Sequence, residues 1–120
     1  LDAGKGRFRV FNGSDQMLFQ GLCTGAIGGI GSTYNYQMRN IAGVYNAMEA
    51  GDFNKAREWQ WKANAVIKVL FHNGANHACE KAIMRLRGFD VGAPRSPLVP
   101  FPPEKMDDLK RQLEEIDFFD

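Results

Sequence analysis

Two short apolar runs, residues 8–11 and 26–30, constrain the fold most, because each ends in a turn of glycine and small polar residues. A helical pattern lies between them, which gives the order of a strand–helix–strand crossover. Such a crossover brings its two strands together in parallel, and parallel sheets are buried on both faces. Two parallel strands alone would leave both outer edges unpaired. The sequence therefore predicts the end of a larger α/β domain rather than a complete one.

Helices are predicted over most of the remaining chain. Capping residues, glycine stops and apolar periodicity place them over residues 14–24, 35–50, 52–72, 76–87 and from 102 onward. In the last four, apolar residues recur at the spacing of one helix face. These predicted buried stripes are Ile41, Val44, Tyr45 and Met48, then Ala63, Val66, Ile67 and Leu70, then Cys79, Ala82, Ile83 and Leu86, then Met106, Leu109, Leu113 and Ile116.

Composition excludes several classes of protein. Apolar residues make up 44% of the 120, and 15 basic residues nearly balance 14 acidic ones. The net charge of +1 argues against a nucleic-acid binder, which would carry a basic patch. No apolar run approaches the roughly 20 residues of a membrane span. Cys23 and Cys79 are too few for a disulfide scaffold, so a reduced, cytoplasmic protein is expected. Because the chain starts at Leu1 rather than Met, we expect that it begins inside a longer reading frame or that a preceding part has been removed.

Function in parallel α/β folds gathers where the strands end. Here those ends are the turns at residues 12–16 and 28–33, which combine glycines with short polar side chains. Glycine lets backbone approach a ligand, and the helix start after each turn offers N–H groups to an anion. The same glycines are equally compatible with tight strand-to-helix turns that bind nothing. A dinucleotide motif is excluded, since Tyr34 stands where its last glycine belongs.

The two turns also carry a resemblance to a known family. Phe11–Gln16 and Gly28–Asn35 resemble the last two barrel-strand motifs of the N-acetylneuraminate lyases, and the spacing between them is similar too. The resemblance continues through Lys81–Met84 and Gly92–Leu98. The wider family of class I aldolases includes dihydrodipicolinate synthase, but the run at residues 31–35 favours the sialic-acid branch.

The resemblance implies the C-terminal part of a (β/α)8 barrel, an α/β fold that typically needs about 250 residues. Residues 1–50 would form the last two strand–helix units, and residues 51–120 a C-terminal extension of three helices. The family's Schiff-base lysine and its proton-transferring tyrosine lie on earlier strands, so this segment would hold no catalytic residue and would be inactive alone. Lys5 is no substitute, because it precedes its strand and would face the opposite end of the barrel.

The implied parent is a lyase that cleaves N-acetylneuraminate to pyruvate and N-acetylmannosamine without a metal or organic cofactor. Its expected partners are the sugar acid and, as in the family, three further copies in a tetramer. Substrate contacts carried over from the family fall on Gly13, Asp15, Gln16 and Ser32. The lyases usually have glutamate at the position of Gln16, which leaves the preferred sugar acid open. The alternatives are another pyruvate-dependent aldolase or synthase, or a non-catalytic helical module that self-associates.

Two other groups of residues receive structural interpretations. His72, His77, Cys79 and Glu80 match no zinc signature, so we expect no metal site, with His72 at the surface of a helix end. Trp59 and Trp61 are two positions apart and cannot share one helix face. One of the pair should pack into the core, and the other is a candidate for a subunit contact.

Overall fold

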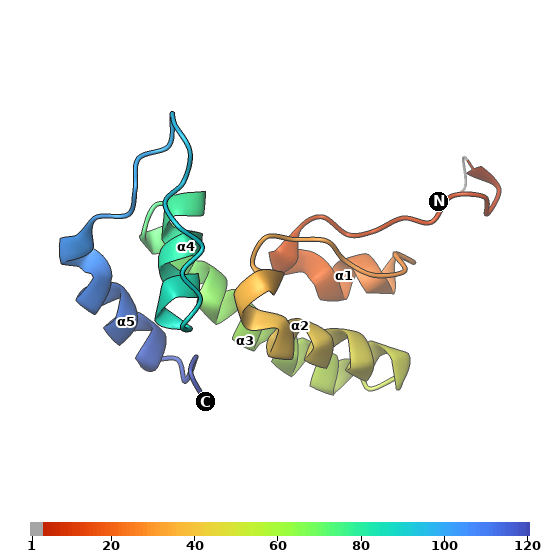
Figure 1. Cartoon of the computed structure of the whole chain (residues 1–120). Coiled ribbons are helices and arrows are strands. Elements are labelled where there is room, and N and C mark those ends of the chain that lie inside the picture. The colour runs from red at the N-terminus through yellow and green to blue at the C-terminus, as the bar shows by residue number, and fades with distance from the viewer. Residues whose placement is uncertain (1–3) are drawn as a thin grey trace. The chain divides into compact units, whose positions relative to one another are not determined.

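The computed structural model describes residues 4–120, so the first three residues of the predicted 1–50 segment lie outside it. The described residues form two compact units, one ending at Asn64 and the other spanning Ala65–Asp120. Five α-helices are labelled in Figure 1, and one of them, α3, contributes to both units. The predicted boundary at residue 50 stays a prediction. No helix in the described part of the chain is long and apolar enough to cross a membrane.

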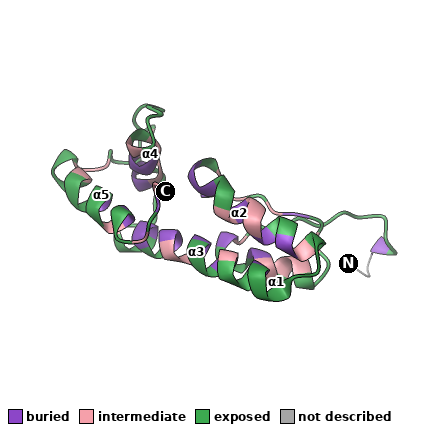
Figure 2. Cartoon of the chain, turned by 90° about the horizontal axis from the view of Figure 1, so that it is seen from below, coloured by how far each residue is buried: buried purple, intermediate pink, exposed green. Residues whose placement is uncertain are grey.

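The N-terminal unit contains two extended segments, helices α1 (Leu18–Cys23) and α2 (Tyr34–Glu49), and the first part of α3 (Phe53–His72). A short 3-10 turn, η2 (Asp15–Met17), leads into α1. Leu18, Ile41, Val44 and Ala63 form the buried core of this unit, and Trp59 packs against it. Figure 2 shows this burial as purple on α2 and α3.

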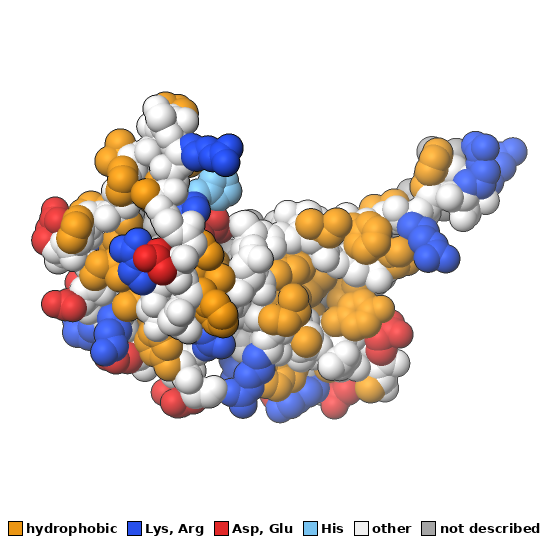
Figure 3. All heavy atoms as spheres, viewed as in Figure 1, with side chains coloured by type: hydrophobic (Ala, Val, Ile, Leu, Met, Phe, Trp, Pro, Cys, Tyr) orange, Lys and Arg blue, Asp and Glu red, His pale blue; other side chains and the backbone are white. Residues whose placement is uncertain are grey.

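The two predicted strands are not strands in the structure. Across residues 4–120 the pairing between them consists of one isolated parallel bridge, from Asn12 to Gly29, and one further backbone hydrogen bond, from the Ile27 amide to the Val10 carbonyl at 2.9 Å. Its direction is the predicted one, but each segment has a partner on one side only, and a regular ladder needs more. Phe8, Phe11 and Ile30 accordingly keep 64%, 51% and 68% of their surface exposed. Figure 3 shows hydrophobic side chains at the surface along these extended segments.

The C-terminal unit contains the rest of α3, α4 (His77–Leu86), the 3-10 turn η3 (Pro103–Lys105) and α5 (Met106–Glu114). Asn76 caps α4, its side-chain oxygen accepting a hydrogen bond from the Cys79 amide at 3.0 Å. The side-chain amide of Asn73 donates to Gln112 Oε1 of α5 at 2.9 Å. Fully buried apolar side chains fill the unit, among them Cys79, Ile83, Leu109 and Leu113.

The predicted helix faces are largely confirmed. The stripe of α3 from Ala63 to Leu70 is buried, and so are the central residues of the α4 and α5 stripes. One position is wrong, because Tyr45 of α2 is exposed while Ala47 is buried. The smaller alanine turns inward here and the phenol faces solvent, which its polar hydroxyl tolerates. Trp59 packs on the core and Trp61 stays 62% exposed, as the spacing required.

Candidate functional site

The two predicted substrate turns lie side by side. The Asn12 amide donates to the Gly28 carbonyl at 2.9 Å, and the Ile30 amide donates to the Asn12 carbonyl at 2.9 Å. This alternation around Asn12 is the hydrogen-bond pattern of parallel backbone pairing. Asn12 also bonds the Ser14 carbonyl through its side chain at 2.6 Å, which closes the first turn. The structure therefore joins the two turns at their bases.

A buried carboxylate ties the turns together beyond the bridge. Asp15 is 8% exposed, and its Oδ2 accepts hydrogen bonds from the Thr33 amide at 3.0 Å and the Thr33 hydroxyl at 2.6 Å. Gln37 in turn donates to the same hydroxyl at 2.8 Å. A Cβ atom placed on Gly31 would lie 1.6 Å from Asp15 Oδ1. The carboxylate therefore requires glycine at this position, and one of its oxygens is used inside the protein.

A buried glutamine of α3 forms hydrogen bonds with the backbone of the first turn and of α1. Gln60 is 2% exposed. Its Oε1 accepts from the Phe19 amide at 2.8 Å, and its Nε2 donates to the Asp15 carbonyl at 3.1 Å and to Asn64 Oδ1 at 3.0 Å. Buried amide groups are costly unless they are paired, and these partners satisfy both ends of the side chain. Gln60 thus connects α3 to η2 and α1.

The remaining predicted site residues are exposed. Gly13, Gln16 and Ser32 lie at the surface, and Gln16 and Ser32 each directly neighbour one of the buried anchors, Asp15 and Thr33. Open space surrounds the position of a Cβ on Gly13, so its backbone is accessible from that side. Together they offer amide, hydroxyl and backbone groups, which suit the hydroxyls of a polyol.

Tyr34 lies near both turns, next to Gly29 of the second and close enough to Asp15 of the first to be affected by its charge. Burial, and next the negative charge of Asp15, raise the pKa of the Tyr34 phenol, while the neighbouring Asn12 side chain opposes them. The phenol therefore stays protonated at neutral pH and can donate a hydrogen bond. A Cβ on Gly29 would approach the Tyr34 hydroxyl to 2.4 Å. Glycine at position 29 is thus explained by the phenol, as glycine at 31 is by the carboxylate.

The interpretation of the sequence missed three residues of this network, Thr33, Gln37 and Gln60. A signal existed for Gln60, since Ala56 precedes it by four positions and Ala63 follows by three, and both are buried. A glutamine on an apolar stripe needs partners inside the protein. Thr33 offered no such signal, because a threonine at the start of a helix is commonly a cap.

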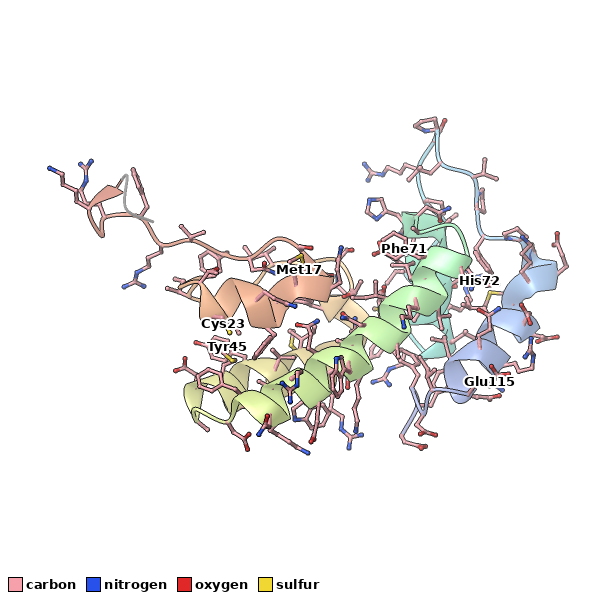
Figure 4. The ribbon with its side chains drawn as sticks, turned by 180° about the vertical axis from the view of Figure 1, so that it is seen from behind. Met17, Cys23, Tyr45, Phe71, His72 and Glu115 are labelled. Carbon is pink, nitrogen blue, oxygen red and sulfur yellow. The ribbon has the colours of Figure 1, made fainter. Side chains whose placement is uncertain are left out.

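The histidine and cysteine cluster lies outside this site. His72 is exposed at the end of α3, as predicted, and His77 Nδ1 lies 2.7 Å from Glu80 in the first turn of α4. Figure 4 labels His72 there, and Cys23 at the end of α1. Cys79 is buried, and burial raises the pKa of its thiol to about 12. Within residues 4–120, no three His, Cys, Asp or Glu side chains are placed to hold a metal ion.

Comparison with known proteins places this geometry in a family. The model of the dihydrodipicolinate synthetase family matches residues 3–116. An aldolase of Thermoproteus tenax, named for 2-dehydro-3-deoxy-D-gluconate and its phosphogluconate counterpart, is 32% identical over 97 residues, which cover 81% of this chain and 32% of the aldolase. The N-acetylneuraminate lyase of Citrobacter koseri is 31% identical over 107 residues, covering 89% of this chain and 36% of the lyase.

Solved structures agree with the match. The N-acetylneuraminate lyase of Proteus mirabilis has a TM-score of 0.82 to this chain at 34% identity, covering 94% of this chain and 38% of the lyase. The chain spans about a third of the length of the curated relatives it matches. The family model, in contrast, covers nearly the whole of this chain. The chain belongs to the dihydrodipicolinate synthetase family.

Proposed function

We propose that this chain supplies two substrate-facing turns of a Schiff-base lyase that cleaves a 2-keto sugar acid into pyruvate and an aldehyde. The observation that carries the proposal is the pair of turns joined at Asn12 and Gly29 and tied by Asp15 to Thr33. This pairing leaves the exposed groups of Gly13, Gln16 and Ser32 on neighbouring turns. Such groups recognise hydroxyls and leave the bond-breaking chemistry to residues elsewhere.

The division of labour follows from the chemistry. A lysine amine condenses with the keto carbonyl of the substrate, releasing water and forming an imine. The protonated imine accepts the electron pair of the breaking carbon–carbon bond, which frees the aldehyde. The resulting enamine takes up a proton, and hydrolysis then releases pyruvate. In this proposal the lysine and the proton-transferring tyrosine belong to polypeptide preceding Leu1, while Gln16 and Ser32 bind the hydroxylated end that leaves as the aldehyde.

Two sugar acids are candidate substrates. N-acetylneuraminate is favoured by the similarity of the chain to the lyases of Citrobacter koseri and Proteus mirabilis. A 2-dehydro-3-deoxy sugar acid is favoured by an equally close aldolase of Thermoproteus tenax. Gln16 bears on the choice, because it is neutral where the resemblance leads us to expect glutamate. We therefore propose a polyhydroxylated 2-keto acid as the substrate class.

The experiment uses protein expressed from the reading frame extended upstream of Leu1. Pyruvate with borohydride should convert the imine into a stable adduct that mass spectrometry detects on a lysine. The 120-residue chain, treated identically, should stay unlabelled. Pyruvate release from each sugar acid, followed with a coupled dehydrogenase, then identifies the substrate. An extended protein that neither traps pyruvate nor releases it would favour the non-catalytic module instead.

The remaining expectations concern assembly and location. We propose a cytoplasmic homotetramer, in which Trp61 is a candidate contact between subunits because it is 62% exposed on α3. The free thiols of Cys23 and Cys79 are consistent with a reducing compartment. Light scattering of the extended protein should give four subunits, and Trp61→Glu should lower that number if α3 lies at the interface.

A further inference from the structure

Helix α1 begins without a cap of its own. No side chain caps the helix at Met17, which precedes its first residue, Leu18. The first amides of a helix have no partner within it, so a buried start needs partners from elsewhere. Gln60 provides one of them, because its side-chain oxygen accepts from the Phe19 amide at 2.8 Å. The start of α1 is thus capped by a side chain 41 positions away in the sequence.

The same side chain also holds the residue that begins η2. Gln60 Nε2 donates to the Asp15 carbonyl at 3.1 Å, so the two ends of one amide group grip the backbone on both sides of Gln16. With an exposed fraction of 2%, Gln60 touches no solvent-borne ligand. It acts on Gln16 only through the backbone at Asp15 and Phe19.

Asp15 also links the first turn to the second. The Asp15 carboxylate holds the amide and hydroxyl of Thr33, the residue directly after Ser32. We propose that Gln60 is a positioning residue for sugar-acid recognition: through Asp15 it fixes the direction of Gln16 and its separation from Ser32. The inference rests on the proposed function and adds the device that sets its specificity.

Two variants of the extended protein distinguish the hydrogen bond that Gln60 makes to Phe19 from the one that it makes to Asp15. Gln60→Leu removes the contacts to Phe19 and Asp15, together with the one to Asn64, at similar volume. In its ionised form, Gln60→Glu keeps an acceptor for the Phe19 amide but loses the donor to the Asp15 carbonyl and to Asn64, so it frees η2 while retaining the cap of α1. Gln112→Leu is the matched control, because it removes a glutamine that pairs with Asn73 and Asp108 in the other compact unit.

The measurements separate positioning from general damage. For both Gln60 variants we expect KM for the sugar acid to rise about tenfold, the effect of displacing one polar contact. The rate of borohydride trapping with pyruvate alone should stay within about twofold of wild type, because pyruvate lacks the hydroxylated end. Gln112→Leu should leave both quantities unchanged. Hydrogen exchange of the peptide containing Phe19 should speed up in Gln60→Leu and less in Gln60→Glu.

Three outcomes would overturn the proposal. An unchanged KM in Gln60→Glu would show that the contact to Asp15 does not set the turn, and this variant decides if Gln60→Leu fails to fold. A parallel fall in trapping and cleavage would show a merely structural role. A wild-type protein that never traps pyruvate would refute the proposed function itself, and the positioning role with it.

Discussion

Replacing Gly31 with alanine tests the tie between the two turns. The added Cβ would lie 1.6 Å from Asp15 Oδ1, 2.3 Å from its Cγ and 2.5 Å from Oδ2, so every atom of the carboxylate group is too close. The backbone at Gly31 does not have a positive φ, so the effect of the substitution is steric. The carboxylate must move, and the hydrogen bonds to Thr33 move with it.

The expected cost follows from those contacts. Hydrogen bonds to a charged acceptor contribute about 1.5–3 kcal/mol each, and two of them join Asp15 to Thr33. Forcing an extra methyl into a packed site costs about 1–3 kcal/mol when neighbours can shift. Moving the carboxylate breaks its hydrogen bonds but relieves the clash. The hydrogen-bond cost and the packing cost are therefore not simply added. We expect Gly31→Ala to lower the free energy of unfolding by about 3–5 kcal/mol.

Urea unfolding followed by circular dichroism measures this cost. Gly13→Ala is the matched control, since nothing lies within 4 Å of its Cβ position, and it should change stability by less than about 1 kcal/mol. In an Asp15→Ala background the clash is gone, so Gly31→Ala should then be nearly neutral. Equal costs of Gly31→Ala with and without Asp15 would refute the reasoning.

Three further results are expected. The pKa of the Tyr34 phenol is raised above its ordinary 10.0, so the unfolded chain loses this proton at a lower pH than the folded protein does. The free energy of unfolding should therefore fall as pH rises above about 10. In Tyr34→Phe the fall should be less steep when unfolding is measured across the same pH range. Native protein treated with a thiol reagent should be modified at exposed Cys23 and not at buried Cys79, as mass spectrometry of the two peptides will show. Asn76→Ala should cost about 1 kcal/mol by removing the cap of α4, and an unchanged thermal midpoint would contradict that role.

The helices were predictable because their apolar spacing and stop signals are local. Gly25, Gly51, Gly74 and Gly88 all adopt positive φ near the ends of helices, as the pattern indicated. The extended segments were identified at the right place but overestimated as strands. A regular strand depends on pairing with neighbouring strands. Whether such neighbours are present cannot be inferred from the amino acids of residues 8–11 themselves.

The candidate site was predictable in position and only partly in role. Glycines and small polar residues marked the turns, and the structure brings them together. The burial of the Asp15 carboxylate was not predicted, because its partner Thr33 lies 18 positions away in the sequence. A carboxylate in a polar turn is ordinarily expected to be exposed to solvent. The expected hydrogen bonds from substrate hydroxyls to Asp15 stay a prediction.

The grip of Gln60 on Asp15 spans 45 positions of sequence. During synthesis the first turn is therefore exposed well before the residue that completes it has been made. The nascent chain must keep Asp15 and Phe19 hydrated until α3 emerges, so a translational pause between α2 and α3 would prolong an immature turn. A protein truncated at residue 50 would remain in that unfinished condition permanently.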